Sequence, residues 1–90
     1  MPFDYKARGA RHQKTLVDFL GAELALGSTL TQSALLSASE NHIEHYEQAK
    51  GGAIAAADTV RRFIKQVEDE RVKAELDERL AKLSSFISTL

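Results

Sequence analysis

Apolar side chains recur every three or four positions through the middle of the chain, between residues 41 and 67. This spacing matches the helical period of about 3.6 residues, whereas a strand would need strict alternation of apolar and polar positions. The apolar side consists of Ile43, Tyr46, Ala53, Ala57, Val60, Ile64 and Val67. Asn41 is a favourable N-cap, and Glu44 three residues later completes a capping-box pattern. We therefore expect one long helix over residues 41–67, at the centre of a small helical bundle.

Very small residues lie on or beside the apolar side of this central helix. They are Ala49, Gly52, Ala53, Ala56 and Ala57. Small residues let a neighbouring helix approach near the low end of the usual interaxial range of ~8–10 Å. The Gly51–Gly52 pair has two explanations, a close contact with the preceding helix or a kink in the helix that contains it. We favour the close contact, because the alanines continue it on the same side.

A first helix is predicted over residues 13–38, and the chain before it, residues 1–12, is predicted to be a flexible basic N-terminal arm. The apolar side of this helix consists of Leu16, Val17, Phe19, Leu20, Leu24, Leu26, Leu30, Ala34 and Leu35. Its weakest point is Gly27-Ser28-Thr29, where the helix could bend or break. The short turn at 37–40 predicts that the first two helices are antiparallel neighbours.

The apolar pattern changes phase near residues 68–70, which predicts a third helix over residues 70–89. Asp69 is a suitable N-cap for it, and Glu70 is favourable in its first turn. The apolar side of this helix consists of Val72, Leu76, Leu80, Leu83, Ile87 and Leu90. Its outer face carries two acid–base pairs four residues apart, Glu75 with Arg79 and Glu78 with Lys82. Residues 13–90 should therefore form one all-α domain, a three-helix antiparallel bundle.

The width of each apolar arc bears on association. The third helix has an arc of roughly 120°, enough for a peripheral helix, whereas the first two helices have arcs of roughly 180°. An isolated bundle would leave part of those wider arcs in water, which predicts a homo-oligomer, most simply a dimer, or a partner helix. The predicted partner-binding residues are Val17, Phe19, Leu26 and Phe63, together with Leu36, which lies outside the apolar arc of the first helix.

Composition narrows the function further. The 90 residues carry a formal net charge of −1, which argues against a dedicated nucleic-acid-binding protein. There is no cysteine, so a disulfide framework, a thiolate nucleophile and a cysteine-based metal site are excluded. No apolar run approaches the ~20 residues that span a bilayer, so we expect no membrane interaction and a cytoplasmic location. No pattern of catalytic residues is present, and we expect neither enzymatic activity nor a cofactor.

His42 and His45 are the candidates for chemistry, because they lie three residues apart near the start of the central helix. Neighbouring helix positions can share a metal ion, although di-metal bundles use Glu-x-x-His and this chain has His-x-x-His. A helical bundle with an exposed histidine also resembles histidine phosphotransfer domains, which carry His-x-x-Lys-Gly. Here His45 precedes Lys50-Gly51 with two additional residues between them. A histidine-centred phosphotransfer or metal-binding protein is therefore the alternative function.

Alanines at regular positions carry a second resemblance. Ala34 and Ala38 in the first helix are followed by Tyr46-x-x-Ala49-x-x-x-Ala53-x-x-Ala56-Ala57 in the second and by the leucine-rich segment 74–83. From about residue 30 to residue 90 the chain resembles a tetratricopeptide-like helical hairpin plus a third helix, the layout of domains of the microtubule-interacting-and-trafficking (MIT) type. This resemblance implies a helix-binding module. The function we expect is thus a non-enzymatic protein–protein interaction or assembly module that uses the apolar surface of the first two helices.

Overall fold

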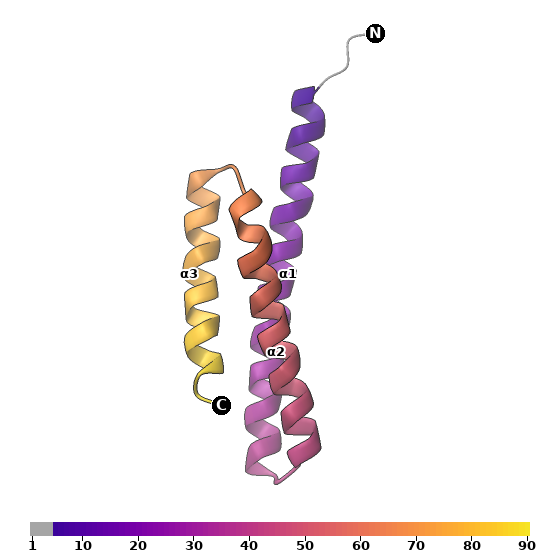
Figure 1. Cartoon of the computed structure of the whole chain (residues 1–90), viewed down its shortest axis with the longest axis vertical. Coiled ribbons are helices and arrows are strands. Elements are labelled where there is room, and N and C mark those ends of the chain that lie inside the picture. Colours follow the sequence, from indigo (N-terminus) through magenta and orange to yellow (C-terminus); the bar gives the residue numbers. More distant parts are fainter. Residues whose placement is uncertain (1–4) are drawn as a thin grey trace.

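A computed structural model describes the backbone of residues 5–90 and the side chains of residues 11–90. The elements in order are helix α1 (Tyr5–Ser39), helix α2 (Ile43–Phe63), a 3-10 turn η1 (Ile64–Gln66) and helix α3 (Glu70–Ile87). Figure 1 shows that α2 returns antiparallel to α1 and that α3 runs back along the upper part of this hairpin. The predicted all-α fold of three helices is confirmed, and the described residues form no strand.

The first helix begins much earlier than the sequence pattern predicts. α1 starts at Tyr5, so residues 5–12, which we expected in a flexible arm, have a helical backbone; residues 1–4 of that arm lie outside the described residues. The other elements of the bundle reach α1 at Gln13, whose side chain donates to the Gln66 carbonyl oxygen and accepts from the Glu68 amide, both at 3.0 Å. The first turns of α1 therefore project beyond the rest of the bundle, as Figure 1 shows.

The main core lies where all three helices run side by side. It is a continuous cluster of Leu16, Leu20, Leu24, Ala57, Val60, Ile64, Val67, Leu76, Leu80 and Leu83. Leu20 and Val60 are fully buried at its centre. Burying one such side chain contributes about 1.5–3 kcal/mol, so this cluster is the main source of stability. Its members on α2 and α3 follow the predicted apolar sides of those helices.

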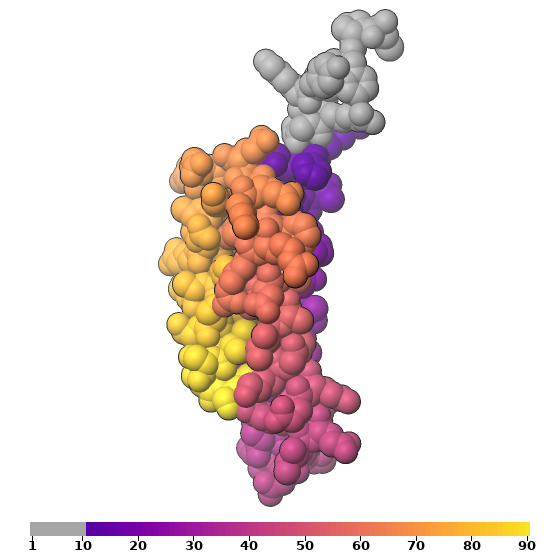
Figure 2. Space-filling view, viewed as in Figure 1, coloured from indigo at the N-terminus to yellow at the C-terminus, as the bar shows by residue number. Residues whose placement is uncertain are grey.

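The α1–α2 hairpin continues below the end of α3, and small residues hold this part together (Figures 1 and 2). The buried positions there are Thr31, Ala34 and Ser37 on α1 and Ala49 and Ala53 on α2. A Cβ atom on Gly52 would lie 2.8 Å from Leu30 Cδ1, so the expected close contact with α1 is present at this glycine. The same atom on Gly51 would meet nothing within 4 Å.

α1 is continuous through Gly27, where the sequence suggested a bend or break. A Cβ atom at this position would lie 2.7 Å from Leu83 Cδ2 and 3.4 Å from the Ala56 Cβ. Gly27 therefore lies where α2 and α3 both pack against α1, and its missing side chain serves that close approach. The Thr31 hydroxyl donates to the Gly27 carbonyl oxygen (2.8 Å), which satisfies a polar group inside this buried stretch.

In the turn between α1 and α2, Asn41 has a different role from the predicted one. Its φ of 61° is left-handed, and its amide and the following His42 amide donate to the carbonyl oxygens of Ala38 (3.3 Å) and Ser37 (2.9 Å). This pair of bonds is a Schellman motif, so Asn41 terminates α1 and does not cap α2. Asn is one of the few residues besides glycine that adopts this conformation readily. α2 begins after His42, which makes no side-chain capping bond.

Ile43 is a second correction. The sequence pattern places it on the buried side of the central helix, but it is 72% exposed. It occupies the first turn of α2, beside the point where α1 has ended at Ser39, so no facing helix covers it.

The turn before α3 matches the prediction from the sequence more closely. Asp69 caps α3, and its carboxylate accepts from the amides of Arg71 (2.9 Å) and Val72 (3.1 Å), as predicted. The Glu78–Lys82 ion pair on the outer face is also present, at 3.5 Å. The Arg79 guanidinium donates instead to the Gly21 carbonyl oxygen on α1 (3.5 Å), so the predicted partner of Glu75 is turned toward the neighbouring helix.

The conformation of Asn41 generates a first prediction. Replacing Asn41 by glycine should keep or slightly raise the free energy of unfolding, because glycine adopts φ near 61° without strain. Asn41→Ala should lower it by about 1 kcal/mol, because alanine lacks the short polar side chain that lets asparagine adopt the left-handed conformation. Urea unfolding at one low protein concentration measures both values. A loss of similar size in both variants would mean that the Asn41 side chain caps α2 after all.

The two adjacent glycines of α2 generate a second prediction. Gly51→Ala should stabilise the protein by about 0.5–1 kcal/mol, because the new methyl group meets open space and alanine favours the helix. Gly52→Ala should gain less or lose stability, because the Leu30 side chain must move away. The two variants are matched controls, and urea unfolding compares them. Equal gains would show that α1 does not press on Gly52.

Candidate interaction surface

One side of the hairpin carries exposed apolar residues and no covering helix. α3 packs on the opposite side, where Arg79 reaches Gly21 and Arg61 donates to the Ser84 hydroxyl (2.7 Å). Phe19, Leu26 and Leu30 follow one another in steps of seven and four residues, so they share the side of α1 that faces away from α3. Phe63 joins them from α2. We call this surface the back face and define it by Phe19, Leu26, Leu30 and Phe63.

The apolar groups of the back face lie in contact with the solvent and with one another. Phe19 is 42% exposed and meets the half-buried Phe63 ring edge-on, with centroids 6.3 Å apart and an interplanar angle of 80°. Leu26 is 48% exposed, and Leu30 is half-buried beside Gly52. Large exposed apolar groups in one row are a mark of an interaction surface, whereas single ones are common on any protein.

The same face has very little charge. On α2 the positions that share it by helical period are Gly52, Ala55, Thr59 and Phe63, none of which ionises. On α1 the row between Thr15 and Ser33 contains one ionisable side chain, the half-buried Glu23. Charged residues make up 28% of the chain, so they are depleted here. Such depletion is typical of the centre of protein–protein interfaces.

The structure brings together three of the predicted partner-binding residues, Phe19, Leu26 and Phe63. Val17 is half-buried and packs against the main core. Leu36 is 61% exposed but lies about 80° further round α1 than Leu26, outside the back face. Leu30 also belongs to the back face and was missing from the predicted partner-binding residues. The seven-and-four spacing of residues 19, 26 and 30 is the signal that identifies Leu30.

The two histidines near the first turn have separate partners. His45 Nδ1 lies 2.7 Å from the Ser37 hydroxyl oxygen, and His42 Nε2 lies 3.7 Å from a Glu40 carboxylate oxygen. His42 and Tyr46 line a shallow pocket of about 250 Å³. Within the described part of the chain no three histidine or carboxylate side chains come together to hold a metal ion. His42 and His45 both line a second open hollow, of about 310 Å³, together with Ile43 and Glu44, but their hydrogen-bond and ion-pair partners differ.

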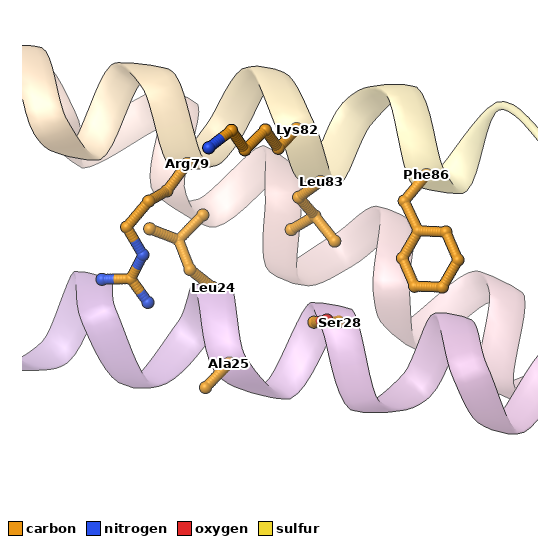
Figure 3. A pocket seen from close by; sticks show the side chains of 7 residues that line it. All are labelled: Leu24, Ala25, Ser28, Arg79, Lys82, Leu83 and Phe86. Carbon is orange, nitrogen blue, oxygen red and sulfur yellow. The ribbon is translucent and has the colours of Figure 1, made fainter.

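A groove of about 460 Å³ lies between α1 and α3, on the side away from the back face. Figure 3 shows Arg79 and Phe86 reaching from α3 toward α1 at its two ends, with Leu24 and Leu83 between the helices. Lys82 lies on the rim of the groove and pairs with Glu78, while the Arg79 guanidinium donates to the Gly21 carbonyl oxygen. Arg79 therefore links α3 to α1, whereas the Lys82–Glu78 pair lies within α3.

Comparison with known proteins gives no identification: no protein family, curated protein or solved structure matches this chain. Among the described residues no helix combines the length and the apolar character needed to cross a membrane. The arguments for function therefore come from the surface of the bundle itself.

The edge-on contact between Phe19 and Phe63 generates a third prediction. A double-mutant cycle of Phe19→Leu and Phe63→Leu should give a coupling free energy of about 0.5–1.5 kcal/mol, because aromatic pairs gain this much beyond their buried area. Urea unfolding of the parent, both single variants and the double variant measures it. A cycle of Phe63→Leu with Leu36→Ala, on a different side of α1, is the matched control and should show additivity. Additivity in the Phe19–Phe63 cycle as well would contradict the contact.

Proposed function

We propose that this protein is a non-enzymatic interaction or assembly module that associates through the back face of its α1–α2 hairpin. The observation that carries the proposal is the combination of the exposed Phe19 and Leu26 with neighbouring positions that are almost free of charge. Either feature alone is weak, since exposed apolar residues and neutral stretches both occur on ordinary surfaces. Together they describe the centre of an interface.

Physical chemistry favours a helix or a helical hairpin as the bound element. The back face is a shallow surface formed by two antiparallel helices, and the row of Phe19, Leu26 and Leu30 has the spacing with which one helix packs on another. Removing the exposed parts of Phe19 and Leu26 from water contributes on the order of 1 kcal/mol each. Clusters of buried aromatic and aliphatic side chains of this kind dominate binding in most interfaces.

The histidine-centred alternative carries no second proposal. His42 and His45 hydrogen-bond or pair with different neighbours, and each is largely exposed at the tip of the hairpin. No observed geometry favours phosphate or metal chemistry there over a polar turn.

A charge placed on the back face provides the test and the fourth prediction. Leu26→Glu should abolish association, because a carboxylate at the centre of an apolar interface loses its hydration without gaining a partner. Leu36→Glu is the matched control: the same substitution, at a more exposed leucine outside the back face, should leave association unchanged. Light scattering coupled to size exclusion measures self-association, and fluorescence anisotropy with a labelled leucine-rich amphipathic helical peptide measures helix binding.

Circular dichroism must show that both variants remain as helical as the parent. The proposal fails if Leu26→Glu and Leu36→Glu behave alike in both assays. It also fails if the parent protein neither self-associates nor binds the peptide at any concentration. Val17 is unsuitable for this test, because it packs against the core and a charge there would unfold the protein.

A further inference from the structure

We propose that a second copy of this chain covers the back face, related by a twofold axis parallel to the helices, so that α1 of each copy packs on α2 of the other. This inference rests on the proposed function and specifies its partner. It makes the assembly a symmetric dimer whose centre is a four-helix layer, with α3 of each copy on the outside.

Within one hairpin, residues of α1 and α2 lie beside each other in a constant register. Leu30 lies beside Gly52, Gly27 beside Ala56, and Phe19 beside Phe63. In each pair the residue numbers add up to 82 or 83, as expected for two antiparallel helices in a constant register. By this register Leu26 of α1 corresponds to Ala56 and Ala57 of α2, next to the exposed Ala55.

The side chains that α1 and α2 contribute to the back face differ in size. α1 contributes large residues, Leu26 and Leu30. At neighbouring levels α2 contributes only small side chains to this face, the exposed Ala55 and the half-buried Thr59, because Ala56 is buried and Leu30 of the same chain covers Gly52. A row of large side chains beside a row of small ones is a self-complementary surface, which is the requirement for a twofold dimer.

The direction of the twofold axis decides which helices of the two copies face each other. An axis parallel to the helices keeps every residue at its own level and places α1 over the partner's α2, so that Leu26 packs over Ala55 and Thr59 of the second copy. Phe19 and Phe63 of both copies then meet in one aromatic cluster. An axis across the helices would instead stack α1 on α1, with large residues on large residues and the two Glu23 carboxylates near each other. Like charges at close range are unfavourable.

The size of the face suits a dimer. α2 together with the 3-10 turn η1 runs beside α1 over residues 43–66, which is about 36 Å at 1.5 Å per residue. Two helices packed at ~8–10 Å present a width of about 20 Å. The resulting area of roughly 700 Å² per copy is close to the ~800 Å² that each partner contributes to a stable interface of standard size. A single foreign helix would cover about half of this width.

Cysteine cross-linking tests the arrangement directly, because the chain has no cysteine of its own. The variants are Leu26→Cys and Ala55→Cys, both at exposed positions, prepared separately, mixed and oxidised. We expect a disulfide-linked dimer in the mixture that contains one chain of each variant, and at least tenfold less product from either variant alone. Leu36→Cys mixed with Ala55→Cys is the matched control and should not cross-link.

Each outcome has a definite meaning. Cross-linking of Leu26→Cys with itself, in preference to the mixed product, overturns the parallel axis while the proposed function stands. A monomeric mass for the parent protein in light scattering up to millimolar concentration overturns the second copy as the partner. The proposed function then depends on whether the amphipathic peptide binds in a Leu26-dependent way. A dimeric mass that Leu26→Glu leaves unchanged overturns both.

Discussion

The close packing of α1 on α2 through small side chains is the constraint on which the rest of the structure depends. Gly27 meets Ala56 and Leu83, and Gly52 meets Leu30, so larger residues at either glycine would force the helices apart. This contact fixes the register of the hairpin from the Asn41 turn to the level of Phe63. The register in turn places leucines from three helices in one core and leaves the phenylalanines together on the back face.

Local rules were sufficient to predict most of the fold. The 3.6-residue period located all three helices, and the phase change near Asp69 located the second turn, because both depend only on neighbouring residues. The errors occurred where the local pattern allows two outcomes, or where a more distant part of the chain decides the outcome. Asn41 is equally suited to start a helix and to end one, and the carbonyl oxygens of Ala38 and Ser37 decide the matter. Ile43 fits the apolar period but lies beyond the end of α1, which the period of α2 alone does not reveal.

The candidate site was predicted only in outline. Arc width indicates that α1 and α2 carry more apolar surface than α3 can cover, but it does not say on which side of the hairpin α3 lies. Phe19, Leu26 and Phe63 therefore could not be separated from Val17, which the core absorbs, or from Leu36, which points elsewhere. That separation needs the position of α3, and contacts such as Arg79 with Gly21 and Arg61 with Ser84 reveal it.

Because α3 ends before the tip of the α1–α2 hairpin, the molecule has a three-helix zone and a two-helix zone that differ in stability. Where all three helices run side by side, leucines and valines bury large apolar areas. Below the end of α3, alanine, serine and threonine side chains hold two helices together and bury much less apolar area per residue. Local opening needs the least free energy where buried apolar contacts are fewest. The tip of the hairpin around the Asn41 turn is therefore the part of the bundle that can separate transiently while the three-helix zone stays closed. Any partner that spans both zones would also act as a clamp on that tip.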